Sequence, residues 1–324
     1  IFLERPGVRD ELRNVVHYLV RVFPDVVRRL DDRLRSAWRE AGFDSALLDA
    51  TALPRVSFGT WVGCDRDGHP LVTAEVTRHT LEHLHEHSVT LMDDTLRSLA
   101  VGLTLSDRLE EILEGLDSRI RETAALMGDA GDRAIARNPK ESFRQFVNLI
   151  RARLPRGDAR FAYRNAAGAV ADLTRLRGWL EDVGAGRLAR HDVDPVIRLV
   201  QTFGFHLAKL DIRQNSRFHD LAVGQLLAAA GIPNGESFAD WDEDARLELL
   251  AAELASPRPL AAPDAALGAE AEAVLSCYRV LRRHIDDRGT DGLGSLIVSM
   301  TRSVSDLLVV YLLAKEAGLT LSLI

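Results

Sequence analysis

The chain has 324 residues, of which 46% are apolar and 27% charged, a balance typical of soluble globular proteins and not of disordered ones. A net charge of -7 argues against general nucleic-acid binding, because that function usually leaves a basic footprint. No apolar run approaches the roughly 20 residues of a membrane-spanning helix, and no basic-then-apolar leader opens the chain. We therefore expect a cytoplasmic protein with no nucleic-acid partner and no membrane partner.

Apolar residues at spacings of three and four predict helices over most of the chain. Residues 9–34 form the first such stretch, in which Pro24 is expected to kink or divide the helix. Residues 80–127 predict one or two further helices. The same periodicity continues in residues 167–183, 218–230, 243–255 and 270–287.

Loops are expected at residues 232–240 and 256–268, where Pro, Gly and Ala interrupt the helical pattern. Neither loop is long enough to prove separate domains, so residues 1–324 are treated as one partial domain. The chain begins at Ile1 and ends on an apolar alternation typical of a strand that has just begun. We expect it to be a piece of a longer protein.

Three short apolar segments break the helical pattern, and polar residues follow each of them: residues 56–62, 205–212 and 296–300. Each is predicted to be a buried strand that delivers polar side chains at its carboxyl end. Because helices separate the three segments, parallel strands wrapped by helices are expected, and such sheets gather functional groups at the carboxyl edge of the strands. The expected fold is mainly α with short parallel strands, as part of a heavily helix-decorated α/β barrel of the TIM type.

The first strand is followed by "GCDRDGHP", in which Gly63 and Gly68 permit turns with positive φ. Asp65 and Asp67 flank Arg66 in this segment. One interpretation is a ligand-binding loop, or a charge network that orients such a loop. The other is a tight Asx turn that satisfies its own hydrogen bonds.

The second strand leads into "LDIRQNSRFHD", where strand alternation places Asp211 and Arg213 on the same side. An arginine held by Asp211 could fork onto a phosphate or a carboxylate, although a structural ion pair is an equal alternative. His219 follows six residues after Arg213 and either reaches the same strand end or supports the start of a helix.

The third strand leads into a helix whose start and end are both marked by the sequence. Ser303 and Asp306 have the spacing of an N-cap and an N3 residue, and Gly318 stands where a C′ residue belongs. Elsewhere His79, His83 and His87 share one predicted helix face with His85 nearby, but an exposed polar face explains this set better than a metal site does.

Three segments resemble, in the right order, successive signatures of the phosphoenolpyruvate carboxylase family: "SFGTWVGCDRDGHPLVTAEVT", "FGFHLAKLDIRQNSRFH" and "SLIVSMTRSVSDLLVVYLLAKEAGL". The opening "RPGVRDELRNVVHYLVRVFPDVVRRL" is similar to the helical region that precedes the first signature. This resemblance covers nearly the whole chain. It implies a largely helical subunit around an eight-stranded α/β barrel, usually assembled as a homotetramer.

The resemblance also implies a reaction. Bicarbonate attacks the phosphoryl group of phosphoenolpyruvate, giving carboxyphosphate and an enolate, and the enolate then captures CO₂ to form oxaloacetate and phosphate. Such chemistry needs cationic donors, Mg²⁺ or Mn²⁺, and a site closed to water. Arg213 matches the substrate-contacting arginine of the family. The segment from Asp65 through Arg66 and Asp67 to Gly68 matches a signature with an expected site-shaping role.

Four more residues match the second signature: Asp211, Gln214, Ser216 and His219. Four positions depart from the family pattern and put details of the pocket in doubt. Asn215 stands in place of Glu, Phe218 of Arg, Cys64 of Gly and His69 of Asn.

The family's histidine signature is expected before Ile1, and its metal-binding acids, His/Lys segment and Gly/Arg loop after Ile324. The chain is thus expected to hold about three barrel strands and no metal ligand, and to be inactive on its own. Two alternatives stay open: a non-catalytic homologue that binds an anionic metabolite, and a structural or interaction module.

Overall fold

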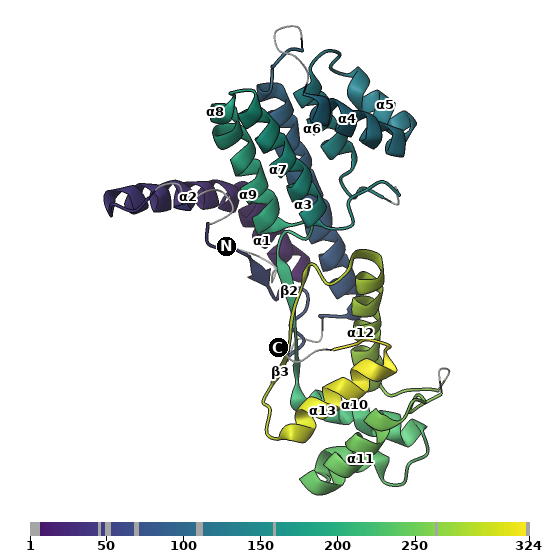
Figure 1. The fold of residues 1–324 in the computed structure, drawn as a ribbon. Coiled ribbons are helices and arrows are strands. Elements are labelled where there is room, and N and C mark those ends of the chain that lie inside the picture. Colours follow the sequence, from purple (N-terminus) through teal and green to yellow (C-terminus); the bar gives the residue numbers. More distant parts are fainter. Residues whose placement is uncertain are drawn as a thin grey trace. The chain divides into compact units, whose positions relative to one another are not determined.

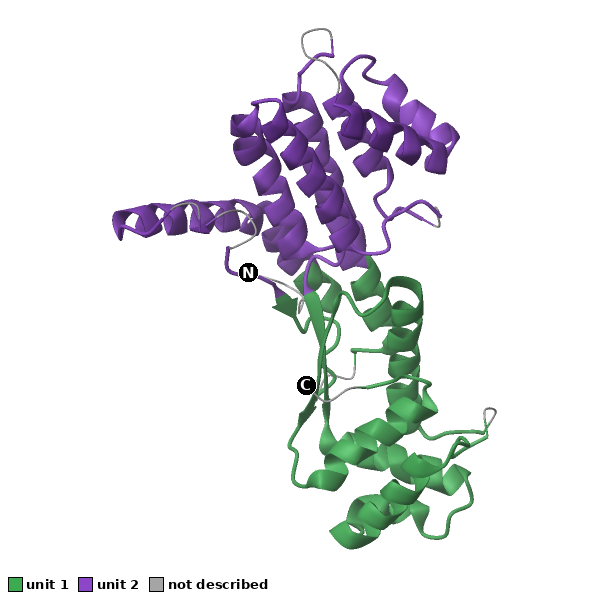
Figure 2. Ribbon diagram, in the orientation of Figure 1, with its two compact units in different colours: residues 1–12, 59–82, 209–324 green, residues 13–58, 83–208 purple. Residues whose placement is uncertain are grey.

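The computed structural model describes most of the chain (Figure 1): residues 7–44, 47–48, 53–67, 71–107, 113–157, 160–262 and 265–321. Contacts within the chain divide it into two compact units (Figure 2). Unit 1 contains residues 1–12, 59–82 and 209–324, and unit 2 contains residues 13–58 and 83–208.

The described elements of unit 2 are helical: α2 (Phe23–Glu40), α4 (Glu114–Met127), α5 (Asp129–Ala136), α6 (Ser142–Ala152), α7 (Ala166–Asp182), α8 (Gly186–Leu188), the π-helical turn η2 (Ala189–Val193), α9 (Asp194–Phe203), and parts of α1 (Val8–Arg21) and α3 (Ala74–Gly102). Helix α6 packs against α4 and α5, and α7 packs against α6 and α9. Leu173, Leu176 and Leu180 are fully buried at helical spacing, so they form the inward face of α7.

Two expectations for the first helices are confirmed. Pro24 divides the 9–34 stretch, since α1 ends at Arg21 and α2 begins at Phe23 with the proline in its first turn. A proline fits there because the first turn of a helix does not need its N–H. Residues 80–127 form two helices, α3 and α4.

Unit 1 contains the sheet and the helices that follow it: β1 (Gly59–Thr60), β2 (Lys209–Asn215), α10 (Ser216–Ala229), the 3-10 helix η3 (Gly235–Asp240), α11 (Glu243–Ala255), α12 (Ala269–Arg288), β3 (Leu293–Ser299) and α13 (Val304–Glu316). The three strands are parallel, in the order β1-β2-β3. The described chain is thus mainly helical with a small parallel sheet. One partial domain over residues 1–324 stays a prediction.

The strands have other bounds than those expected. Strand β2 begins at Lys209 instead of 205, because Gly204 and Leu207 have φ of 52° and 65°, which an extended strand cannot contain. Strand β3 ends at Ser299, before Met300 with φ 57°. Strand β1 has only two residues, and its pairing with β2 resumes further on, at the bridge between Asp65 and Arg213.

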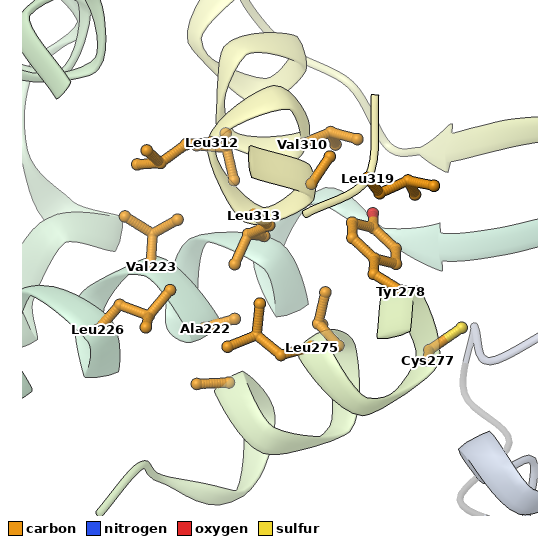
Figure 3. Packing of buried hydrophobic residues seen from close by; sticks show 14 of the residues in the cluster. Ala222, Val223, Leu226, Leu275, Cys277, Tyr278, Val310, Leu312, Leu313 and Leu319 are labelled. Carbon is orange, nitrogen blue, oxygen red and sulfur yellow. The ribbon is translucent and has the colours of Figure 1, made fainter. Parts of the chain in front are cut away.

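The core of unit 1 lies between α10, α12 and α13 (Figure 3). Ala222 and Val223 from α10 are buried with Leu275 from α12 and Leu313 from α13. Fully burying a side chain of the size of leucine contributes about 1.5–3 kcal/mol. Because α10 follows β2 without a break, this packing also fixes the carboxyl end of β2.

Candidate functional site at the carboxyl ends of the strands

A tight turn follows β1. The backbone N–H groups of Cys64 and Asp65 both donate to the carbonyl of Trp61, at 2.9 and 3.0 Å. Gly63 in this turn has φ 87°, and a Cβ at that position would lie 2.2 Å from the Oγ1 of Thr80. The turn therefore needs glycine for two reasons, its backbone conformation and the close approach of Thr80.

The turn is joined to the end of β2 by backbone hydrogen bonds. Arg213 donates its N–H to the carbonyl of Cys64 at 3.1 Å, and Arg66 donates to the carbonyl of Arg213 at 3.0 Å. This is the parallel bridge between Asp65 and Arg213. Two of the predicted strand-end segments consequently meet at the same edge of the sheet.

The side chain of Arg213 lies between two carboxylates of that turn. Its Nη2 is 3.5 Å from the Oδ2 of Asp67, and its Nη1 is 3.9 Å from the Oδ2 of Asp65. A charge-assisted hydrogen bond is usually about 2.7–2.9 Å long. The carboxylates thus orient the guanidinium without occupying its donors at short range, and 45% of the side chain is exposed.

The third strand also reaches this site. The Oγ of Ser299, the last residue of β3, donates to the Oδ2 of Asp67 at 2.7 Å. The backbone N–H of Asp67 donates to the Oδ1 of Asp65 at 3.2 Å, which is the Asx turn anticipated as the alternative for this segment. The turn satisfies part of its own hydrogen bonding, yet its two carboxylates also face Arg213.

Arg66 contacts another set of residues. Its guanidinium donates to the Sγ of Cys277 and to the Oγ1 of Thr77, both at 2.6 Å. Cys64 lies beside them, with its Sγ 3.5 Å from the same Thr77 oxygen. Burial raises the pKa of the Cys64 thiol to about 12 and also raises the pKa of Cys277. Arg66 therefore binds neutral groups and fastens the turn to α12.

Asp211 does not hold Arg213, contrary to the suggestion from strand alternation. Its Oδ1 accepts the backbone N–H of Ser295 in β3 at 2.8 Å. A Cβ at Gly294 would lie 2.0 Å from that oxygen, so the glycine makes room for the carboxylate. Asp211 therefore links β2 to β3 by a side-chain hydrogen bond.

The residues after Arg213 shape the passage from β2 into α10. The buried Gln214 accepts the backbone N–H of Asn215 at 2.9 Å, and the Asn215 side chain caps α10 by accepting the N–H of Arg217, also at 2.9 Å. Ser216 donates its hydroxyl to the carbonyl of Met300 at 2.8 Å, which joins this passage to the end of β3.

His219 lies in the core and not at the exposed edge. It is 1% exposed, and its Nε2 is 3.3 Å from the hydroxyl of Tyr278. Burial lowers the pKa of His219 to about 4, so the imidazole is neutral near neutral pH. These contacts favour the structural interpretation of this histidine. Gly68 and His69 lie outside the described residues.

Sequence reasoning missed a charge network next to the start of α13. Asp306 is fully buried and accepts from the backbone N–H of Arg302 at 2.7 Å, from the Arg302 side chain at 2.8 Å and from Arg246 at 3.1 Å. The same two arginines donate to Asp220, which is also fully buried. The spacing of Arg302 and Asp306 by four residues was the available signal, but nothing local indicated Asp220 or Arg246.

The expected N-cap and N3 positions of α13 are confirmed, since Ser303 precedes Val304 and Asp306 is the third residue of the helix. Ser303 is the N-cap residue, but its side chain makes no cap bond; it donates to Glu243 of α11 at 2.8 Å. Glu243 in turn accepts the backbone N–H of Ser305 at 3.0 Å, so α13 is capped from another helix. Gly318 follows the helix with φ 68°, as a C′ glycine does.

Within the described ranges, no group of three or more His, Cys, Asp or Glu side chains could hold a metal ion. The two acids at the strand ends, Asp65 and Asp67, face a guanidinium. Nor is any helix of the described chain long and apolar enough to span a bilayer.

The strand order and the oriented arginine at the carboxyl edge define a helix-rich α/β protein with a cationic group at the end of a parallel sheet. Comparison with known proteins gives the family. The family model described as phosphoenolpyruvate carboxylase matches residues 1–323, and the chain belongs to that family.

Curated relatives agree with this assignment. The chain is similar to proteins named phosphoenolpyruvate carboxylase from Nocardia farcinica (36% identical), Rhodothermus marinus (37%) and Chromobacterium violaceum (33%). The alignments cover 98%, 98% and 96% of this chain, and 35%, 34% and 34% of those relatives. The chain thus spans about a third of the length of the relatives it matches.

Proposed function

We propose that this chain supplies part of the active site of a phosphoenolpyruvate carboxylase, which joins bicarbonate to phosphoenolpyruvate and produces oxaloacetate and phosphate. The supporting observation is Arg213, which is half exposed at the carboxyl edge of the sheet and oriented by Asp65 and Asp67. Family membership gives this arginine its chemical context.

In this proposal Arg213 binds the phosphoryl group of the substrate. A planar guanidinium presents paired donors that match phosphate oxygens, and its positive charge stabilises the negative charge that grows as bicarbonate attacks phosphorus. Asp65, Asp67 and Ser299 keep the guanidinium in place by the contacts described above. The side chain is thereby oriented before substrate binds, so less side-chain freedom is lost on binding.

The remainder of the catalytic machinery is assigned to the rest of a longer protein. In this proposal Mg²⁺ or Mn²⁺ is bound by residues outside this chain, and the metal would stabilise the negative charge of the phosphoryl group and the enolate. Strands β1 and β3 are the edges of the described sheet, and β3 exposes Ile297. Further strands added at these edges would complete an α/β barrel, in a cytoplasmic homotetramer.

The test uses a chimaera in which this chain replaces the matching third of the Rhodothermus marinus relative. Arg213→Gln should lower the kcat for bicarbonate-dependent phosphate release by about 10²-fold or more, as expected for loss of a donor to developing charge. Arg217→Gln is the matched control, because Arg217 is an exposed arginine nearby in the chain, the second residue of α10. Its activity should remain close to that of the parent chimaera.

Calorimetric titration of the chimaera with phosphoglycolate, together with its turnover, separates the alternatives. Binding that depends on Arg213, in a chimaera without turnover, would favour a non-catalytic anion-binding homologue. Unchanged binding and unchanged turnover in Arg213→Gln would favour a structural module. Phosphate release by the 324-residue chain alone would contradict the assignment of the remaining machinery to other segments.

A further inference from the structure

Unit 2 contains a cavity of about 860 Å³, which is lined mainly by residues of α2 and α9 and also by residues of η2 and α3. This volume is within the range of ligand pockets, roughly 300–1,000 Å³. None of the residues that line it takes part in the strand-end contacts described above. The cavity therefore needs an explanation of its own.

The lining is positively charged, although the whole chain carries a net charge of -7. Six arginines and four aspartates line the cavity, which leaves an excess of two positive charges: Arg28, Arg35, Arg39, Arg177, Arg190 and Arg198 against Asp25, Asp31, Asp32 and Asp194. A concave site with a net charge of one sign raises the local concentration of ligands of the opposite sign. The charge excess thus favours an anion.

Two of these arginines are already neutralised within the unit. Arg198 forms a bidentate pair with Asp31, at 2.8 and 3.1 Å, in which both side chains are less than 10% exposed. Arg177 donates its Nε to Asp194 at 2.7 Å. The buried Arg198 pair joins α9 to α2, two of the elements that line the cavity.

Three arginines of the lining form no ion pair within 4.0 Å among the residues that the structure describes: Arg35, Arg39 and Arg190. The charge of Arg35 does act on Asp194, whose close partner is Arg177. Arg35 is half-buried on the face of α2 that lines the cavity. Arg190 is exposed in η2, a different element of the lining. A ligand in the cavity could pair with guanidinium groups from two elements.

The rest of the lining is apolar. Val27 and Phe203 are buried, and the half-buried indole of Trp38 also faces the cavity. Ligand sites combine such apolar walls with a few polar groups that fix the orientation of the ligand. The lining is therefore suited to an anion that also has an apolar part.

The backbone of η2 gives an independent indication. The N–H of Asp194 donates to the carbonyl of Ala189, five residues earlier, instead of four as in an α-helix. Pro195 follows and lacks the N–H that an α-helix would direct to His191. Single π-helical turns are frequent at functional sites, and this turn places Arg190 and His191 in the cavity lining.

We propose that this cavity binds a small organic anion whose apolar part packs against Trp38 and Phe203 and whose acidic group pairs with Arg35 and Arg190. The site belongs to unit 2 and is independent of the activity proposed for the strand ends. Its ligand is defined by chemistry, as a carboxylate, sulfonate or phosphate attached to an aromatic or aliphatic body.

The test is a fluorescence titration of the full 324-residue chain with two dyes of nearly the same shape. One is 8-anilinonaphthalene-1-sulfonate, and the other is N-phenyl-1-naphthylamine, which lacks the sulfonate. The sulfonate should bind at a single site and at least about tenfold more tightly than the neutral dye, because a charge-assisted contact is stronger than a neutral one.

Arg35→Gln and Arg190→Gln should each weaken binding of the sulfonate about tenfold and leave the neutral dye unchanged. Arg29→Gln and Arg187→Gln are the matched controls, since both arginines are exposed near the same elements but outside the lining. Thr95→Phe, which fills the cavity from α3, should weaken both dyes.

Three results would overturn the proposal. The first is equal affinity for the two dyes, and the second is unchanged sulfonate binding in both lining variants. The third is loss of bound dye as the chain self-associates, measured by sedimentation. A second copy of the chain would then be the occupant of the cavity.

Discussion

Arg66 and Cys277 are 211 positions apart in the chain, yet the Nη1 of Arg66 lies 2.6 Å from the Sγ of Cys277. Thr77 accepts from the same guanidinium and also contacts Cys64. The only two thiols of the sequence are thus gathered behind the strand-end turn, in a place where burial keeps them protonated.

This relationship predicts a loss of stability in alkali. The pKa of Cys64 is about 12 in the folded chain and 9.0 for a thiol exposed to water, so above about pH 9 the unfolded state releases a proton that the folded state keeps. Unfolding then becomes easier by up to about 1.4 kcal/mol for each pH unit between these two values. Urea unfolding at about pH 8 and pH 10 should show that the free energy of unfolding decreases less between these pH values in Cys64→Ala than in the unchanged chain. An equal decrease in the two proteins would contradict the shifted pKa.

The strand-end turn should tolerate no side chain at Gly63. Alanine there would adopt φ 87° and would also place its Cβ 2.2 Å from Thr80, so we expect Gly63→Ala to cost about 2–5 kcal/mol, the sum of backbone strain and overpacking. Gly42→Ala is the control for strain alone, because Gly42 has φ 79° and nothing within 4 Å of the added atom. Its free energy of unfolding should fall by about 1 kcal/mol. Thermal or urea unfolding of the two variants measures the difference.

His219 should make the protein sensitive to acid. Its pKa is about 4 in the folded chain against 6.5 for a free imidazole, so the unfolded state takes up a proton first as pH falls. The free energy of unfolding is unaffected by this group above about pH 6.5 and falls as the pH drops from there to about pH 4. The loss is about 2 kcal/mol at pH 5. His219→Gln cannot titrate and should lose less stability between about pH 7 and pH 5. If both proteins lose the same amount, the imidazole is not held neutral.

Much of the strand-end site could be predicted from local sequence. Short apolar runs followed by charged residues indicated three strands with helical connections, and the segments around Asp65 and Arg213 do meet at one edge. Arginine is abundant in this sequence, so its presence alone did not mark a functional residue. Arg213 could be selected because it lies at the carboxyl end of a predicted strand.

The partners of these residues could not be predicted, because they depend on contacts between distant segments. Asp67 and Ser299, which form a hydrogen bond, are 232 positions apart. Arg213 contacts Asp65 and Asp67 instead of the expected Asp211, because the bridge between Asp65 and Arg213 places the turn beside β2. The start of β2 was missed because Leu207 adopts a positive φ, a conformation that leucine rarely takes.

A buried carboxylate in unit 2 gives the last prediction. Asp172 is 3% exposed and accepts four hydrogen bonds of 2.8–2.9 Å, from Arg119, Arg153, Arg175 and Tyr163. Removing its charge leaves partly buried guanidinium groups unpaired, so Asp172→Asn should lower the free energy of unfolding by about 3–5 kcal/mol. Asp117→Asn is the matched control, because its pair with Arg121 is exposed and such pairs contribute below about 1 kcal/mol. Urea unfolding of both variants decides, and losses of similar size would show that Asp172 does not hold the arginines of this unit together.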